Sequence, residues 1–517
     1  MIKKICLLLC YTFTLFAGKY EEKLSVLYNS LDQSSLSQLF AFYHLYSDAP
    51  EGEQAFKQAW NLVNKHRPFP ISPLSELSIF QFDIEAMIAL VTKQSYQDLT
   101  LLTDSQIQII NHVCSHLKNR NLKGSKLWEI SKVDALPVEE IDLARALFLH
   151  QFGEKARQEI QTHEAYLDMM ALQILSRLDK NPTHLQILEG INHFIFYEMR
   201  YRFPPHSMWA KDIDLYTFLP SVLDSRHGVC LGVSILYLSL AQRLDLPLEI
   251  ITPPGHIYLS FNNGDETINI ETTARGIHLP SETYLSINTR TLKKRTLREV
   301  IGLNFFNAAS TKWHRQEYQK AVDLYEKALT YLPKDPLLYT LLGYNYLFLN
   351  KENKGKIFLE LALKNPSDEF VYNDMTAKDF LKGKVNAKGI QVIYQEVDET
   401  RESILKKQKN IQEILQIYPK FRDGIFHLAI TYLQLGRSKE ALETLEKYHL
   451  IDQNNPTVEY YLATLAMQRY QFYKASKHLI QCEKITAKKN HNPSVLKNLR
   501  NSLRKESLLL SQTNLPF

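Results

Sequence analysis

The sequence is poor in cysteine and carries little net charge. Five of its 517 residues are cysteine, and the formal net charge is only +5. Such a small charge gives no argument for nucleic acid or an anionic membrane as a partner. No cysteine pair has the CxxC spacing of a zinc site, and we find no glycine-rich phosphate loop and no nucleotide or flavin motif. We therefore expect no metal, no cofactor and no nucleic-acid partner.

Long apolar runs are also missing, except at the N-terminus. Lys3 and Lys4 precede an apolar run from Ile5 to Ala17. A basic start and an apolar run of this length are typical of a secretory signal peptide, and the run is short for a membrane-spanning helix. We predict a signal peptide over residues 1–18, no other transmembrane span, and an exported protein that is periplasmic, secreted or envelope-associated. The alternatives are anchoring by an uncleaved leader and a buried first helix.

The remaining chain divides by pattern into four segments. Leucines at three- and four-residue spacings predict a helical domain over residues 19–180. Residues 181–300 mix helices with two short strands and form the predicted core. Residues 301–500 are expected to be helical repeats, and residues 501–517 a tail. The predicted fold class is α+β, with a helical domain before the core and an α-helical array after it.

The C-terminal half shows a period of about 34 residues, the length of a tetratricopeptide repeat. The copies cover about 302–335, 336–369, 422–455 and 456–489. Small residues recur where the two helices of a repeat cross, and they include Ala321, Ala328, Gly343, Gly355, Ala362, Ala429, Ala441, Ala463 and Ala475. Stacked repeats leave a concave surface that typically binds a protein or peptide, although some arrays only brace a neighbouring domain. The sequence carries no signal for an oligomeric state.

A basic segment, Leu292–Val300, leads into the repeats. Its charges are most simply explained as the solvated face of a helix, and an acidic partner is the alternative.

Cys230 is the first candidate for chemistry. Without the leader only Cys114, Cys230 and Cys482 remain, and three widely separated cysteines do not make a disulfide framework. From Cys230 the sequence is almost entirely apolar or small up to Gln242, which predicts a buried helix with Cys230 at its N-terminus. Backbone N–H groups there favour a thiolate. The alternative is that Cys230 is only a small core residue.

A hairpin supplies a histidine and a carboxylate. The stretch Pro253–Phe261 is typical of a turn followed by a strand, and Asn263–Gly264 predicts a two-residue hairpin turn before a second strand. That turn places His256 directly opposite Glu271, with Cβ atoms about 5 Å apart, so the carboxylate can orient the imidazole. Taken singly, the two residues are more simply a strand histidine and a solvated edge residue.

These motifs resemble a known family. The string VLDSRHGVCLGVSILYLSLAQRLDLPL, the following PGH, and the spacing from Ile270 to Gly276 are similar to the transglutaminase-like, papain-like core of SirB-type bacterial proteins. The similarity runs over about residues 180–366 and includes the first two repeats. It implies Cys230 and His256 as two members of a Cys-His-Asp triad. The acidic position falls at Glu271, where Asp is usual.

The resemblance and the pattern together predict a cysteine-dependent amide hydrolase or acyl transferase. His256 would accept the thiol proton, Cys230 would attack an amide carbonyl, and Glu271 would orient His256. Trp209, Tyr258 and Asn269 are further candidates for lining the cleft. The alternative function is a non-catalytic scaffold whose repeats bind protein partners.

Overall fold

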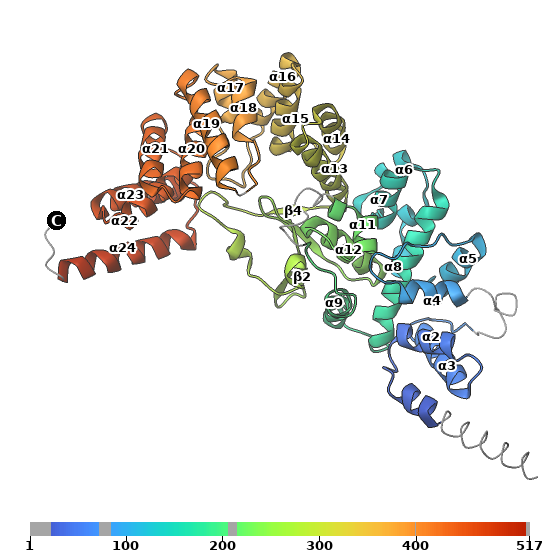
Figure 1. Cartoon of the computed structure of the whole chain (residues 1–517). Helices are drawn as coiled ribbons and strands as arrows, with labels where there is room; N and C mark the ends of the chain where they lie inside the picture. Colours follow the sequence, from blue (N-terminus) through green and yellow to red (C-terminus); the bar gives the residue numbers. More distant parts are fainter. Residues whose placement is uncertain (1–21, 72–83, 205–214, 399, 513–517) are drawn as a thin grey trace, which may run out of the picture. The chain divides into compact units, whose positions relative to one another are not determined.

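The computed structural model describes residues 22–71, 84–204, 215–398 and 400–512. They fall into two compact units. The first unit holds the described residues up to Glu249 and Leu259–Ile277, and the second holds Ile250–Tyr258 and the described residues from His278 onward. Helices dominate both units, and the strands are short and antiparallel (Figure 1). The predicted leader, residues 1–18, lies outside the described residues.

The first unit is built around a long buried helix, α8, against which α7 and α12 pack (Figure 1). From Thr162 to Ser176 every residue of α8 is buried, and its buried carboxylates, Glu164 and Asp168, are paired with arginines. The principal elements of the unit are α2 (Leu36–Leu45), α3 (Pro50–Asn64), α4 (Ile84–Thr92), α5 (Asp104–Val113), α6 (Ile130–Asp134), α7 (Leu143–Phe152), α8 (Arg157–Arg177), α9 (His184–Asn192), α11 (Leu219–Ser225), α12 (Cys230–Arg243), β2 (Tyr258–Asn262) and β3 (Thr267–Ile270).

The hairpin of β2 and β3 forms, but its register differs from the prediction. Leu259 pairs with Ile270 and Asn262 pairs with Thr267, so four residues connect the strands instead of two. The slip is two residues, and side chains alternate with a period of two, so the predicted apolar face is kept. The predicted pairing of His256 with Glu271 is wrong, because the ladder ends at Leu259 and Ile270.

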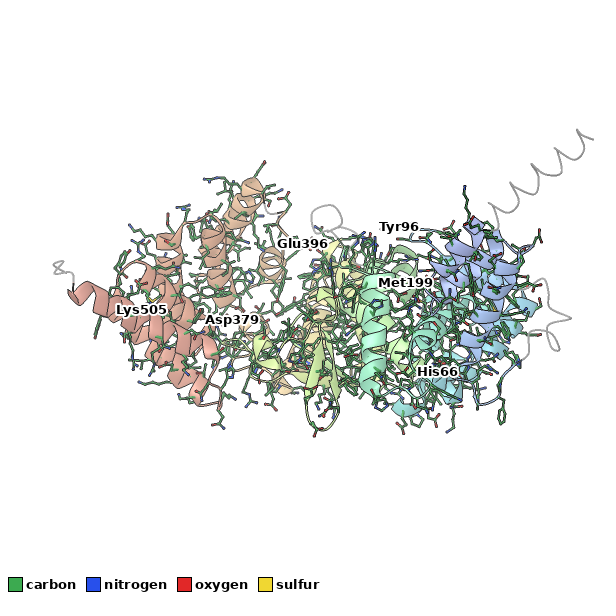
Figure 2. The ribbon with its side chains drawn as sticks, turned by 90° about the horizontal axis from the view of Figure 1, so that it is seen from below. His66, Tyr96, Met199, Asp379, Glu396 and Lys505 are labelled. Atoms are coloured by element: carbon green, nitrogen blue, oxygen red, sulfur yellow. The ribbon has the colours of Figure 1, made fainter. Side chains whose placement is uncertain are left out.

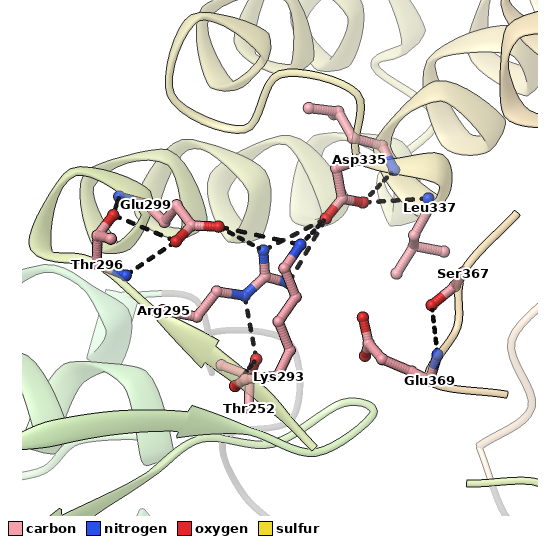
Figure 3. A network of polar contacts seen from close by, with 10 residues as sticks. Thr252, Lys293, Arg295, Thr296, Glu299, Asp335, Leu337, Ser367 and Glu369 are labelled. Carbon is pink, nitrogen blue, oxygen red and sulfur yellow. Dashed lines mark hydrogen bonds and ion pairs between the residues drawn. The ribbon is translucent and has the colours of Figure 1, made fainter. Parts of the chain in front are cut away.

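In the second unit, β1 (Glu249–Thr252) pairs antiparallel with β4 (Lys293–Arg295). Arg295 donates from Nε to the Thr252 hydroxyl at 3.0 Å and from Nη1 to Glu299 at 3.1 Å, and Nη1 lies 3.4 Å from Asp335 (Figure 3). Lys293 adds a second cation 3.7 Å from Asp335. The basic segment is therefore not a solvated helix face: three of its residues form β4, and the Arg295 side chain is only 9% exposed.

Two residues of this network also start helices. Thr296 and Glu299 form a capping box at the start of α13. Asp335 accepts hydrogen bonds from the backbone N–H groups of Leu337 and Leu338 at 3.1 Å each, which caps α15 before Pro336 (Figure 3). Burial raises the pKa of the nearby Glu369 carboxyl, and Arg295 and Lys293 oppose that rise. The network thus joins β4 to the first two helical pairs.

Within the described residues, the segment predicted to hold the repeats contains four helical pairs. They are α13 (Leu297–His314) with α14 (Tyr318–Tyr331), α15 (Pro336–Phe348) with α16 (Glu352–Lys364), α20 (Arg422–Gln434) with α21 (Ser438–Ile451), and α22 (Pro456–Gln468) with α23 (Phe472–Ala487). Small residues lie at the crossings. A Cβ added at Gly355 would stand 2.5 Å from Leu347, and Ala441 and Ala475 are buried. The α-helical array is confirmed.

The irregular segment between the second and third predicted repeats is also helical. It contains α17 (Thr376–Leu381), α18 (Ala387–Ile393) and α19 (Arg401–Ile417). Because α19 packs against both α18 and α20, it occupies the place of a second repeat helix, although α18 is short. Asp379 of α17 is labelled in Figure 2. It is fully buried and accepts hydrogen bonds from the Arg422 guanidinium, the shorter at 2.7 Å. This ion pair fixes the segment to α20.

The chain ends in a further helix, α24 (Ser494–Gln512), which covers part of the predicted tail 501–517. Among the described helices, none combines the length and the hydrophobicity that a membrane crossing requires.

Candidate cysteine site

Cys230 is the first residue of α12, as predicted. The N-cap residue of α12 is Val229, whose side chain cannot accept a hydrogen bond. The backbone N–H groups of the first turn of α12 are therefore not capped by the N-cap side chain. The first turn of α12 lies very close to the backbone of Tyr216. A Cβ added at Gly232 would stand 2.2 Å from the Tyr216 carbonyl oxygen. A glycine is therefore required two residues after the cysteine.

Cys230 differs from the other described cysteines in its surroundings. Cys114 and Cys482 are buried, and Cys230 is partly exposed. Burial raises the pKa of the Cys114 thiol far above its usual range and that of Cys482 to about 12. Cys482 also donates to the Pro456 carbonyl at 3.2 Å. Of these three cysteines, only Cys230 is partly exposed to solvent.

Glu271 lies in the same unit, at the start of a short 3-10 helix, η7 (Thr272–Ala274). Its carboxylate is only slightly exposed and accepts hydrogen bonds from the Thr273 N–H and hydroxyl, at 3.2 and 2.5 Å. The next residue, Thr272, meets the Ser234 hydroxyl at 3.1 Å and lies 3.5 Å from the Cys230 carbonyl oxygen. The structure therefore brings the Glu271 segment to the first turn of α12.

His256 lies in the second unit, at the end of a tight turn. Its backbone N–H donates to the Pro253 carbonyl at 3.1 Å, and Gly255 has a φ of +70°. Pro254 followed by a glycine with positive φ is the pattern of a type II turn, which explains the PPGH sequence. The imidazole stacks on the Tyr284 ring, with centroids 5.6 Å apart. The turn and the stacking partner both restrict the orientation of the ring.

The other candidates have separate positions. Tyr258 is buried, stacks on Tyr284 and meets the Ser281 hydroxyl at 2.9 Å. Asn269 is buried and accepts a hydrogen bond from Ser260 at 2.9 Å. Trp209 lies outside the described residues. The approach of His256 to Cys230 stays a prediction, since the two residues belong to different units.

Two residues that sequence reasoning missed contribute to these surroundings. Thr272 joins the acidic segment to α12, and Tyr284 supports the imidazole. The only signal for Thr272 was its position directly after Glu271. No motif marked Tyr284, because its role depends on a loop that folds back beside the histidine.

Comparisons with known proteins assign the two regions. A model of the transglutaminase-like superfamily matches residues 161–328, and a tetratricopeptide repeat model matches residues 423–455. The chain thus contains a transglutaminase-like domain followed by tetratricopeptide repeats, and the predicted fold class is confirmed. The domain match begins within α8, earlier than the predicted core, and ends within α14.

Similarity to individual proteins is more limited. A stretch of 90 residues is 27% identical to F-box only protein 21 of Mus musculus and 26% identical to that of Homo sapiens. It spans 17% of this chain and only 13% of those relatives. One similar solved structure is TTC0263, a TPR protein of Thermus thermophilus, with 17% identity, coverage of 40% of this chain and 99% of that chain, and a TM-score of 0.20. Another is the TPR2AB domain of yeast Sti1 in a pHSP90 complex, with 18% identity, coverage of 40% of this chain and 85% of that chain, and a TM-score of 0.21.

Proposed function

We propose that this chain, which joins a transglutaminase-like domain to tetratricopeptide repeats, is a cysteine-dependent amide hydrolase or acyl transferase. The observation that carries the proposal is the position of Cys230, a partly exposed thiol at the N-terminus of a buried helix within the matched domain. Buried structural cysteines, such as Cys114 and Cys482, lack both features.

In the proposed reaction, His256 takes the proton from the Cys230 thiol, and the thiolate attacks an amide carbonyl. The amine leaves with a proton from His256, and a thioester forms on Cys230. The Cys230 backbone N–H, at the helix N-terminus, is the natural donor to the oxyanion. Water then releases an acid, and an amine acceptor instead gives a new amide.

Glu271 remains our candidate for orienting His256, but the argument for it changes. The observed hairpin register does not pair Glu271 with His256, so the pairing no longer supports this role. Its support is now the family resemblance and the contacts between its segment and the first turn of α12.

An activated ester tests the proposal. Mixing the full-length chain with 4-nitrophenyl acetate should release a burst of nitrophenolate close to one equivalent and leave an acetyl group on Cys230, seen by peptide mass spectrometry. Cys230→Ala should lose the burst, and Cys482→Ala should keep it, because that thiol is buried. Acetylation elsewhere in the chain with Cys230 unmodified would contradict the proposal.

A non-catalytic scaffold is the second candidate, and the helical repeats favour it. Their paired helices continue through α17–α19 as well, which gives an extended array for a protein or peptide partner. In that case Cys230→Ala would leave partner binding and every acyl-transfer readout unchanged.

We also propose export, with a cleaved leader, and a SirB-type relationship. Sequencing of the mature protein from its native host should begin near Gly18 or Lys19. An intact Met1 on a cytosolic protein would refute export.

A further inference from the structure

Three helices of the last predicted repeats bring together two imidazoles and a carboxylate. His449 comes from α21, Glu459 from α22 and His478 from α23. Both imidazole rings lie within hydrogen-bond distance of the Glu459 carboxylate. His449 Nδ1 is 2.5 Å from Oε1, and His478 Nδ1 is 2.8 Å from Oε2. The rings meet edge to face with centroids 5.0 Å apart. Both Nδ1 atoms thus converge on one carboxylate.

The burial of this cluster distinguishes it from an ordinary surface ion pair. The Glu459 side chain is 0% exposed and that of His478 is 6% exposed, while His449 is 19% exposed. A carboxylate this deeply buried needs a compensating positive charge. A proton on one imidazole can supply it, and so can a divalent cation held by neutral imidazoles.

The donor set suits zinc. One potential ligand atom from each residue lies within 4.8 Å of the other two. A Zn²⁺ ion sits about 2 Å from each nitrogen or oxygen ligand, and a His₂Glu set with one open position is a known arrangement for it. His449, the most exposed of the three, gives an approach from solvent.

We propose that His449, Glu459 and His478 bind a Zn²⁺ ion that ties α21, α22 and α23 together. The ion bonds to one nitrogen of each histidine and to the carboxylate, and water takes the fourth position. Zinc affects stability because it binds the folded cluster and not the separated residues. No sequence motif marks this site, because the three residues stand 10 and 19 positions apart on separate helices.

The test is calorimetric titration of the chelator-treated, full-length chain with ZnCl₂. We expect one Zn²⁺ per chain and a higher melting temperature with zinc. Glu459→Gln and His449→Gln should each weaken zinc binding by at least about 100-fold, more than the 10- to 100-fold typical of residues that only hydrogen-bond to a metal ligand. Replacing Zn²⁺ with Co²⁺ should give the visible absorption of a tetrahedral site in the unaltered chain and in neither variant.

Two controls separate this cluster from other donors. Cys230→Ala removes the thiol of the candidate cysteine site. His314→Gln removes a similar but more exposed pair, in which His314 Nδ1 lies 2.9 Å from Glu396. Both should keep full zinc affinity.

Absence of binding to the unaltered chain would overturn the inference. So would binding that is lost in Cys230→Ala and kept in Glu459→Gln. If Glu459→Gln fails to fold, His449→Gln decides the question, because this position is partly exposed and Gln can still bond to the carboxylate.

Discussion

At the scale of single residues, one buried carboxylate supports the helix that carries Cys230. Asp168 of α8 is fully buried and pairs with Arg243 of α12 at 2.7 Å and with Arg120. Arg243 is itself almost completely buried and also donates to the Ser239 carbonyl at 3.0 Å. Two guanidinium groups therefore depend on one carboxylate, so the stability of the first unit should be sensitive to its charge.

Asp168→Asn removes that charge and keeps the shape of the side chain. We expect the free energy of unfolding to fall by roughly 3–5 kcal/mol, because a buried guanidinium loses its counter-charge. Urea denaturation followed by circular dichroism measures the change. The matched control is Glu53→Gln, which breaks an exposed pair with Lys57 and should change stability by less than about 1 kcal/mol. Equal effects in the two variants would contradict the importance of burial.

His427 predicts a dependence of stability on pH. Burial, followed by a smaller contribution from Lys407, lowers the pKa of His427 to about 4. In the unfolded chain the pKa is about 6.5, so the unfolded state binds more protons between these values. The free energy of unfolding should therefore fall as the pH drops from about 6.5 to about 4, by about 1–3 kcal/mol.

Replacing His427 by Leu should reduce this slope in urea titrations at several pH values. His314→Leu, at a side chain that is 48% exposed, serves as the control and should leave the slope unchanged. A slope that is the same in His427→Leu would show that this histidine is not the responsible group.

At the scale of elements, the hairpin shows what local sequence can predict. The two strands and their apolar faces could be predicted from the alternation of apolar and polar residues, because a register shift of two residues leaves each side chain on the same face. The length of the turn could not be predicted in this way. A two-residue type I′ turn requires positive φ at both central positions, and Gly264 has a φ of +98° while Asn263 does not have a positive φ. The Asn263 side-chain oxygen instead accepts hydrogen bonds from the backbone N–H groups of Asp265 and Glu266, at 2.9 Å each. These bonds stabilise a longer loop.

The helical array was predictable because each crossing imposes the same requirement for a small residue. Ala441 is completely buried at such a crossing. Ala441→Leu should reduce the melting temperature and cost about 1–3 kcal/mol through overpacking. Glu443→Leu on the exposed side of the same helix is the control and should change stability little. Unchanged stability in Ala441→Leu would mean that the repeat register is set incorrectly.

At the scale of the whole molecule, the candidate site draws on distant segments of sequence. The helix of Cys230 and the turn of His256 were each predictable, because an apolar run and a Pro-Pro-Gly sequence are local signals. Thr272 and Tyr284 were not, because their contacts depend on how loops fold back onto these elements. The proposed zinc-binding cluster has no local sequence signal for the same reason, since its three members lie on separate helices.

The central claim is that Cys230 is activated by His256. Labelling with iodoacetamide at about pH 6, well below the ordinary cysteine pKa of about 8.5, tests it most directly. Cys230 should react faster than Cys114 and Cys482 in the folded chain, because both of those thiols are buried. His256→Ala should slow the labelling of Cys230, and Glu271→Gln should slow it less, since Gln can still accept a ring N–H. Equal rates at Cys230 with and without the imidazole, in a folded protein, would contradict the catalytic account and favour the scaffold.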